Sequence, residues 1–254
     1  MGMREKPESL VYGINPVLQA LRFSQRACRK LVVEQGRPGP RIRPILDLAR
    51  QNGIRVETLP RAVFGKKYAD RTHQGIVGHF SPKQTLSLDE LIRHAFGQTP
   101  QPTLVVLDCI QDPQNMGAVI RSAEAQGIQG IVLPKNRSAP LNDTVAKCSA
   151  GAIETLPIAT VTNLSQALKT LKSAGFWIVG VAMDGVKTCD DFSFDSPTAL
   201  VLGGEEKGIR PLLKRACDFT VRIPMDGTVG SLNVAAAGAV LFYEISRQKR
   251  RKPV

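Results

Sequence analysis

The fold class of this chain is decided by the string Leu202-Gly203-Gly204-Glu205-Glu206-Lys207-Gly208, together with one string before it and one after it. The earlier string is Asp112–Ser122, DPQNMGAVIRS, and the later one is Ile223–Val234, IPMDGTVGSLNV. Each follows an apolar, strand-like run and brings glycine or small polar residues to a strand end or a helix start. Backbone N–H groups are exposed at such places and can approach a ligand closely. Three strings in this order therefore predict one composite ligand site.

The composition is that of an ordinary globular protein, with room for one large domain or two modest ones. Of the 254 residues 43% are hydrophobic, and the longest apolar runs, such as Val234–Tyr243, fall short of the ~20 residues that a bilayer span needs. No segment resembles a signal peptide, so we expect a cytoplasmic protein. The cysteines form no C-x-x-C pair and the histidines have no metal spacing, so neither a disulfide framework nor a metal site is expected.

The charge is strongly positive and unevenly distributed. The net charge is +12, and residues 1–98 hold 17 Lys and Arg against 8 Asp and Glu, a balance of +9. Residues 99–254 hold 17 against 14, a balance of +3, and five of those cations lie in Arg247–Lys252. A generally solvated basic surface is one interpretation of this excess. A phosphate-rich partner is the favoured one, through the front of the chain and its tail.

Periodicity predicts two domains joined by a linker. Residues 1–80 have the pattern of a small α/β domain, with helices over 14–22 and 42–51 and strands over 30–34, 54–58 and 75–80. Residues 81–102 are rich in turn signals around a helix over 88–96, which predicts the linker. Residues 65–74 are expected to be a basic loop that suits phosphate contacts and base stacking. Its RNA-binding candidates are Lys66, Lys67, Arg71, His73 and Gln74.

Residues 103–254 alternate again between strand and helix patterns. Strands are expected over 104–107, 130–133, 176–181, 199–202 and 219–223, and helices over 116–126, 164–173, 211–215 and 234–248. This alternation predicts an α/β fold: an open, mainly parallel sheet covered by helices, with its ligand site at the carboxyl ends of the strands. The chain has no P-loop motif, no G-x-G-x-x-G fingerprint after a strand and no G-x-S-x-G elbow, which excludes the common sites of those types.

The polar side chains within the strings have both structural and chemical interpretations. Asn115 is a possible helix N-cap, and Ser231 and Asn233 are cap-type residues as well. Arg121 is either a solvated cation or a guanidinium held against the body and aimed at an anion. Glu205 is either a solvated acid or an acceptor for a ligand hydroxyl or amine. The helix from Val234 is apolar on nearly every face, so it is buried inside the fold or against a second subunit.

Taken together, the strings resemble the three motifs of the SpoU or TrmH-type branch of the SPOUT RNA ribose methyltransferases. The resemblance covers essentially the whole chain, with further support from Tyr12–Val17, His73–Val77 and Lys135–Leu141. Within the branch, the likeness is greatest to the bacterial enzymes that methylate a guanosine 2′-hydroxyl in the peptidyl-transferase P loop of 23S rRNA. It implies a SPOUT α/β-knot domain over 103–254, with a C-terminal trefoil knot, behind an L30e-like RNA-binding domain over 1–80. Pattern rules alone would not have proposed the knot.

The resemblance also implies a cofactor, partners and residue roles. The cofactor is S-adenosylmethionine, and the partners are 23S rRNA or a large-subunit assembly intermediate and a second copy of the chain, with the last helix in the interface. The donor pocket is implied to contain Leu202, Gly203, Gly204, Ile223, Met225 and Leu232. The catalytic set is Asn115, Arg121, Glu205, Ser231 and Asn233, and the family's role for Arg121 is to activate the ribose 2′-hydroxyl. Because a guanidinium scarcely deprotonates, we expect Arg121 to clamp the adjacent phosphate and to stabilise the developing alkoxide instead. Glu205 is preferred to Glu206 because of the G-x-E-x-x-G register from Gly203 to Gly208.

Two alternatives stay open at this point. One is a tRNA ribose 2′-O-methyltransferase of the same branch, against which the front domain argues, because minimal tRNA enzymes of this branch lack it. The other is a non-catalytic RNA-binding factor of ribosome assembly. The presence of all five catalytic candidates argues against that reading.

Overall fold

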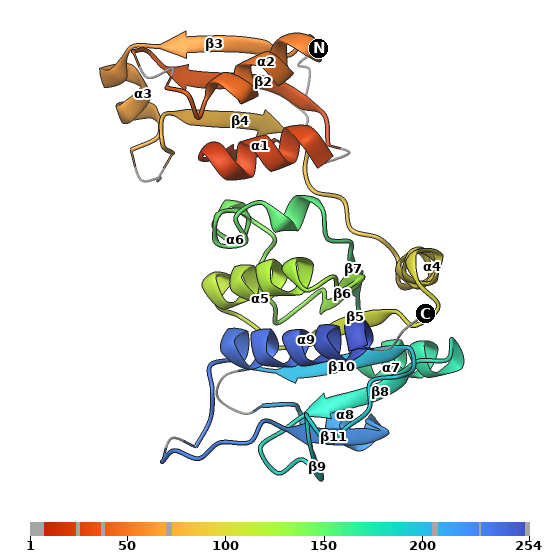
Figure 1. Ribbon diagram of the computed structural model, residues 1–254. Coiled ribbons are helices and arrows are strands. Elements are labelled where there is room, and N and C mark those ends of the chain that lie inside the picture. Colours follow the sequence, from red (N-terminus) through yellow and green to blue (C-terminus); the bar gives the residue numbers. More distant parts are fainter. Residues whose placement is uncertain are drawn as a thin grey trace. The chain divides into compact units, whose positions relative to one another are not determined.

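The chain divides into two units, each with its own sheet and core (Figure 1). The computed structural model describes residues 8–23, 26–36, 39–69, 73–204, 208–228 and 230–251. The first unit contains residues 1–84 and 141–155, and the second contains residues 85–140 and 156–254.

The first unit is built on a four-stranded sheet in the order β1-β4-β2-β3. β4 is antiparallel to β1 and β2, whereas β2 and β3 are parallel. Helices α1 and α2 cover one face around Leu31, Ile45 and Phe80, and α3 covers the other face through Phe64. The elements are β1 (Ser9–Tyr12), α1 (Ile14–Phe23), β2 (Cys28–Glu34), α2 (Arg43–Gln51), β3 (Arg55–Leu59), α3 (Arg61–Lys67) and β4 (Ile76–Phe80).

A segment from the middle of the chain completes this unit. Helix α6 (Asp143–Cys148) packs on β1, and the 3₁₀ helix η1 (Ala152–Glu154) packs on α1. Arg26 Nη2 lies 3.2 Å from Glu154 Oε1, and both side chains are buried. The sequence placed residues 141–155 in the second domain. The compact units divide differently, because this ion pair and these helix contacts join partners more than 100 positions apart.

The second unit is a seven-stranded sheet in the order β7-β6-β5-β10-β8-β11-β9, and every neighbouring pair is parallel. Strands β5 to β7 extend the sheet on one side of β10, and β8, β11 and β9 extend it on the other. The order of connection therefore reverses around β5 and β10, which is where open parallel sheets place their ligands. The strands are β5 (Thr103–Asp108), β6 (Gly130–Pro134), β7 (Ile158–Val161), β8 (Trp177–Val181), β9 (Lys187–Thr188), β10 (Thr198–Gly203) and β11 (Phe219–Arg222).

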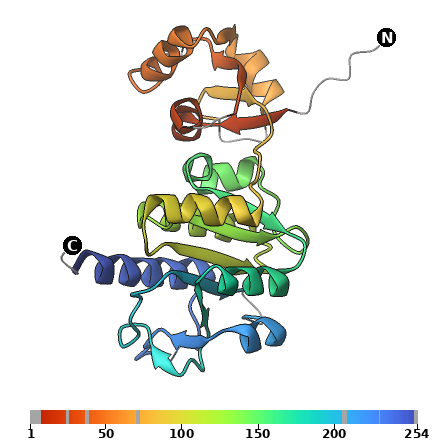
Figure 2. The same ribbon diagram turned by 90° about the vertical axis from the view of Figure 1, so that its right-hand side faces the viewer.

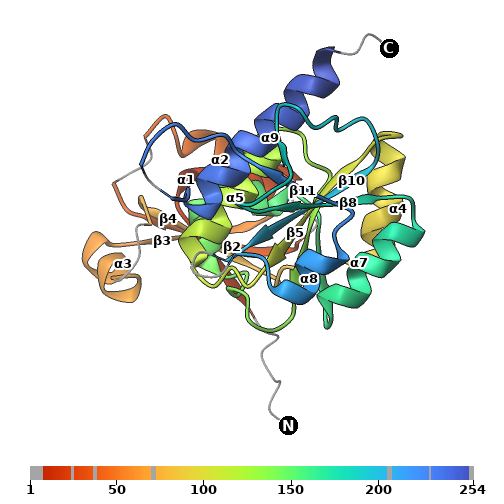
Figure 3. The ribbon, with the colours of Figure 1, turned by 90° about the horizontal axis from the view of Figure 1, so that it is seen from below.

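Helices cover both faces of this sheet (Figures 2 and 3). One face carries α4, α7 and α8, which bury Leu91, Leu168 and Leu213 against the strands. The other face carries α5 and α9, which pack side by side. Buried side chains alternate along the strands between the two faces, as a covered sheet requires. These helices are α4 (Leu88–Gln98), α5 (Pro113–Ala125), α7 (Leu164–Ser173), α8 (Pro211–Ala216) and α9 (Val234–Arg251).

The predicted parallel α/β sheet is confirmed, and the differences concern short elements. β1 and β7 have four residues each and α6 has six, too few for a periodic pattern to stand out. The predicted linker contains α4, whose Leu91 and Ala95 are fully buried in the second unit. The predicted basic loop begins inside α3, because Phe64 anchors that helix to the core. No helix among the described residues is long and apolar enough to cross a membrane, and no three metal-binding side chains cluster in that part of the chain.

Candidate active site

A cavity of about 610 Å³ opens at the carboxyl ends of the strands of the second unit. Its walls come from the residues that follow β8, β10 and β11 and from the start of α9. We call it the carboxyl-edge cavity. Its volume lies in the range of about 300–1,000 Å³ that is typical of small-molecule sites. It is lined by Val181, Ala182, Met183, Asp184, Leu202, Gly203, Gly204, Gly208, Ile209, Lys214, Ile223, Met225, Ser231, Leu232, Val234 and Ala237.

All the predicted donor-binding residues lie together in this cavity. The cavity lining includes Leu202, Gly203 and Gly204 after β10, and Ile223, Met225 and Leu232 from the third string. Ser231 of the catalytic set lines it too. Met225 and Leu232 are exposed although they are large and apolar. The second and third strings therefore meet around one apolar space, and the binding of a donor there stays a prediction.

The glycines of the second string shape a tight turn. The Gly208 N–H donates to the Gly204 carbonyl at 2.9 Å, and Gly208 has φ of +60°, which favours glycine. A Cβ added to Gly203 would lie 2.0 Å from the Gly208 carbonyl carbon, so only glycine lets the two ends of the turn approach this closely. Glu205 lies outside the described residues.

An ion pair with a buried carboxylate anchors this turn to the neighbouring strand. Asp108 ends β5 and is fully buried, and its carboxylate accepts from Arg210 N at 3.0 Å and from Arg210 Nε at 2.8 Å. The guanidinium and the backbone of Arg210 therefore bind the same carboxylate just beyond the glycine turn. Sequence reasoning missed Asp108. An acid at the end of the apolar run 104–107 was the available signal.

The first and third strings meet through a hydrogen bond between two amides. Asn233 Nδ2 donates to Asn115 Oδ1 at 3.0 Å across 118 positions of sequence. Asn233 Oδ1 also accepts from Ala235 N at 2.9 Å, so Asn233 is the N-cap of α9 as well. The N-cap of α5 is Asp112 rather than Asn115, because the Asp112 side chain accepts from Gln114 N. Asn115 therefore does not cap its own helix, and its side chain contacts the third string instead.

Arg121 lies apart from the cavity. It is two turns into α5 and exposed, and it makes no hydrogen bond or ion pair with a described residue. Six helical positions rotate a side chain by about 120° relative to Asn115 and move it about 9 Å along the axis. Arg121 is also not among the residues that line the cavity. Of the two interpretations of Arg121, the structure therefore favours the solvated cation, because the side chain is exposed.

The loop after β8 supplies a wall that the sequence analysis missed. Met183 and Asp184 follow this strand and line the cavity together with Lys214 of α8. Lys214 Nζ donates to Asp184 Oδ2 at 2.5 Å, and this bond lowers the pKa of Asp184 below its ordinary value. The signal was the end of a predicted strand, the same signal that identified the other walls.

In the first unit, the predicted RNA-binding residues have different environments. Lys66 and Lys67 are exposed at the end of α3, whereas Tyr68 is buried, which rules out its use as a base-stacking platform. His73 Nδ1 accepts from Gly75 N at 3.0 Å, and Gln74 Oε1 accepts from Ile14 N at 2.9 Å at the start of α1. Both side chains thus stabilise the local fold. The remaining candidate, Arg71, lies outside the described residues.

Comparisons with known proteins agree with this architecture. A model of the SpoU rRNA methylase family matches residues 102–243, and a model described as RNA 2′-O ribose methyltransferase substrate binding matches residues 10–86. The 23S rRNA (guanosine-2′-O-)-methyltransferase RlmB of Pseudomonas aeruginosa is 40% identical over 242 residues, 94% of this chain and 96% of the relative.

Two crystal structures are similar along most of their length. The SpoU methyltransferase AviRb from Streptomyces viridochromogenes has a TM-score of 0.81 at 25% identity, covering 96% of this chain and 90% of that chain. An AdoMet-bound rRNA methyltransferase from Sinorhizobium meliloti has a TM-score of 0.78 at 25% identity, covering 94% and 87%.

Proposed function

This chain belongs to the SpoU rRNA methylase family, and on that premise we propose that it methylates the ribose 2′-hydroxyl of a guanosine in 23S rRNA. The methyl donor is S-adenosylmethionine. One observation carries the proposal: the second and third strings line one cavity, and the Asn115–Asn233 bond joins the first string to the third. The peptidyl-transferase P loop is the target that the sequence resemblance favours.

The carboxyl-edge cavity fits the proposed donor. Leu202, Ile223 and Leu232 would hold the adenine between apolar walls, and the glycine backbone at Gly203 and Gly204 would approach its polar edge. When bound, S-adenosylmethionine supplies a sulfonium-activated methyl group. Because the methyl is already electrophilic, the chain chiefly needs to orient the ribose oxygen toward it. We assign the orientation of the ribose oxygen to four residues: Asn115, Glu205, Ser231 and Asn233.

We assign to Arg121 the stabilisation of the negative charge that develops on the ribose oxygen. A guanidinium scarcely deprotonates in a protein, so Arg121 does not act as a general base. It binds the phosphate beside the reacting ribose and stabilises the developing alkoxide. Its exposure and its lack of a partner among the described residues leave its donors available to RNA.

We also propose a homodimer, in which Arg121 of one protomer serves the carboxyl-edge cavity of its partner. Ala236, Val240 and Tyr243 are spaced along one face of α9, and all three are exposed. The opposite face, with Leu241 and Phe242, is buried within the unit. An apolar helix face without a cover favours a protein partner. Sedimentation of the wild type and of Tyr243→Glu tests this: a dimer is expected to dissociate in the variant.

The first unit is proposed to bind the rRNA, a role supported by its family match over residues 10–86. Its RNA-binding surface contains Lys66 and Lys67, which are exposed. Replacing both by Ala should weaken rRNA binding and flatten its dependence on salt, since fewer counterions are released. Two features of the resemblance, the L30e-like character of this unit and the trefoil knot, stay predictions, and a cytoplasmic location follows from the proposed substrate.

The decisive experiment is to map ribose methylation in cells with and without this protein. Nuclease fragments of rRNA and tRNA are compared by mass spectrometry. The proposal expects one guanosine of 23S rRNA to lose its 2′-O-methyl group in the deletion strain. Loss of a tRNA methyl group instead would identify a tRNA enzyme, and no change in either RNA would favour an assembly factor.

A further inference from the structure

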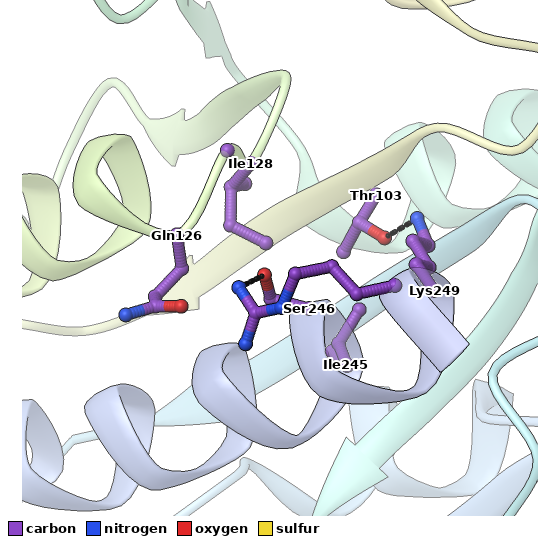
Figure 4. Close-up of a pocket in the computed structure, with 8 residues that line it drawn as sticks. Thr103, Gln126, Ile128, Ile245, Ser246 and Lys249 are labelled. Carbon is purple, nitrogen blue, oxygen red and sulfur yellow. Dashed lines mark hydrogen bonds between the residues drawn. The ribbon is translucent and has the colours of Figure 1, made fainter. Parts of the chain in front are cut away.

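A second cavity lies at the opposite edge of the same sheet, where strands β5 and β6 begin (Figure 4). We call it the amino-edge cavity. Its volume is about 260 Å³, and the last turns of α9 form one of its walls. Strand β10 has six residues, so the two cavities lie roughly 20 Å apart along the strands. The amino-edge cavity is lined by Thr103, Gln126, Gly127, Ile128, Ile245, Ser246, Lys249 and Arg250.

Lys249 holds its ammonium group at this cavity. Its Nζ donates to the Gln101 carbonyl at 2.6 Å. It also donates to Thr103 Oγ1 at 2.7 Å (Figure 4). An ammonium group has three donors, so one is left over after these two bonds to described residues. The two partners are neutral oxygens. They orient the cation without neutralising it.

Arg250 supplies a second positive charge to the same cavity. Its Nη1 donates to Ser246 Oγ at 2.8 Å, and its guanidinium lies 5.8 Å from the centre of the Tyr243 ring. These contacts fix the side chain and leave further guanidinium donors available. The lining contains no acid, so the cavity carries two cations and no anion among its described residues.

Burial makes this arrangement unfavourable unless an anion is present. The cavity has an apolar floor, Ile128 and Ile245, and burial alone lowers the pKa of Lys249 to about 8. The groups around Lys249 are Thr103 and the Gln101 carbonyl from the start of β5, Gln126 and Ile128 from the α5–β6 connection, and Ser246 and Arg250 from its own helix. Arg250 is the one charged side chain among them. A bound anion would therefore restore the charged form of Lys249.

We propose that the amino-edge cavity binds a phosphodiester group of the RNA substrate through Lys249 and Arg250. This inference rests on RNA being the substrate. Two cations on a concave surface suit one phosphate, and the surrounding charge favours a polyanion over a small free anion. Five cations lie in residues 247–252, and the last turns of α9 extend beyond the rest of the second unit (Figure 3). RNA would thus contact both edges of the sheet.

The test uses Lys249→Met, which keeps most of the side-chain length, and Arg250→Gln as a second variant. Lys169→Met is the matched control, because Lys169 is exposed on α7 at the other face of the sheet. The probe is a full-length 23S rRNA transcript, titrated by filter binding over a series of salt concentrations. Each cavity variant should raise the Kd about tenfold, as for the loss of one charge-assisted hydrogen bond. The slope of log K against log[salt] should fall by about 0.7–0.9.

A second measurement reports whether Lys249 takes up a proton when rRNA binds. Calorimetric titrations near pH 8 in buffers of different ionisation enthalpy should show proton uptake when rRNA binds the wild type and the control, and less uptake for Lys249→Met. An rRNA affinity and salt slope equal to those of Lys169→Met would overturn the proposal. A changed oligomeric state with unchanged rRNA affinity would also overturn it, because the occupant would then be a carboxylate of another chain.

The two proposals fail in different ways. Wild-type protein that methylates no rRNA would refute the proposed function. Wild-type protein that methylates 23S rRNA while both cavity variants bind it like the control would refute the phosphate site alone.

Discussion

The two ends of β5 carry two different kinds of site. At the carboxyl end, Asp108 anchors a glycine turn, and the cavity beside it is shaped by backbone and apolar walls. At the amino end, Thr103 orients Lys249, and the cavity there is defined by two cationic side chains. A site shaped by backbone tolerates few substitutions, because its geometry requires glycines, which have no side chain. A site made of long cations acts through charge, so single changes weaken it gradually.

The largest effect is expected at Arg121, which lines neither cavity of its own chain. Arg121→Ala should lower the rate of methyl transfer by roughly 100- to 1,000-fold, the usual loss when one stabilising donor is removed from a developing oxyanion. The affinity for S-adenosylmethionine should stay the same, because Arg121 does not line the carboxyl-edge cavity. Single-turnover rates and donor titrations measure the two effects. Arg93→Ala, at an exposed position of α4, is the control, and a large loss of donor affinity in Arg121→Ala would contradict the assignment.

The anchor at the carboxyl end is tested by Asp108→Ala. The substitution leaves the positive charge of Arg210 without its buried carboxylate partner. We therefore expect the free energy of unfolding to fall by about 3 kcal/mol. This is the low end of the usual range, because the Arg210 side chain is 40% exposed. Chemical denaturation measures it. Asp47→Ala, which removes an exposed pair in α2, should change stability by less than about 1 kcal/mol. A similar loss of stability in both variants would show that the Asp108–Arg210 pair adds little to the free energy of unfolding.

The shape of the glycine turn is tested by Gly203→Ala. The added Cβ would overlap the Gly208 carbonyl carbon, and relieving such overlap costs about 1–3 kcal/mol, or roughly 5- to 150-fold in donor affinity. Calorimetric titration with S-adenosylmethionine measures the change. Gly97→Ala has no atom within 4 Å of the added Cβ, so it should leave donor affinity unchanged. An unaffected Gly203→Ala would mean that the turn does not shape the cavity.

The two roles of Asn233 can be separated by Asn233→Asp. Aspartate keeps the cap on α9, so stability should hold, but it cannot donate to Asn115 Oδ1. Loss of one hydrogen bond is worth about 1 kcal/mol, so methyl transfer should fall by roughly fivefold to tenfold. Asn233→Ala should lose both activity and stability. The prediction fails if Asn233→Asp is as active as the wild type.

The last prediction concerns the amino end and its dependence on pH. The pKa of Lys249 is about 8 in the folded chain against 10.5 for an ordinary lysine, so the unfolded chain binds more protons between these values. The free energy of unfolding of the wild type therefore rises with pH across this window. Without RNA, Lys249→Met should be more stable than the wild type below pH 8, and the advantage should shrink toward pH 10.5. Thermal unfolding at pH 7 and pH 10 measures it, and equal differences at both would contradict a buried, charged Lys249.

The contrast between the two ends also explains what could be predicted from sequence. Gly203, Gly204 and Gly208 are constrained by their own turn, so their spacing predicted a cavity whose lining includes every donor candidate. The polar contacts at the two ends of β5 could not be predicted from the sequence. Asp108 and Arg210 are 102 positions apart, and Lys249 and Thr103 are 146 positions apart. Only the folded sheet brings these residues together.

In the first unit the composition predicts a larger set of exposed RNA-binding side chains than the fold presents. The segment 65–74 combines cations with an aromatic residue, and this pattern predicts an RNA-binding loop. In the fold, Tyr68 is buried, while His73 and Gln74 hydrogen-bond to the backbone of Gly75 and Ile14. A charged or polar side chain does not reveal from sequence whether it faces solvent or satisfies a neighbouring backbone group.

A crystal structure of the protein with S-adenosylhomocysteine tests the proposed site most directly. The adenine is expected between Leu202, Ile223 and Leu232, with the sulfur directed toward the Asn115–Asn233 pair. A ligand bound elsewhere in the molecule, or an empty carboxyl-edge cavity at saturating ligand, would contradict it.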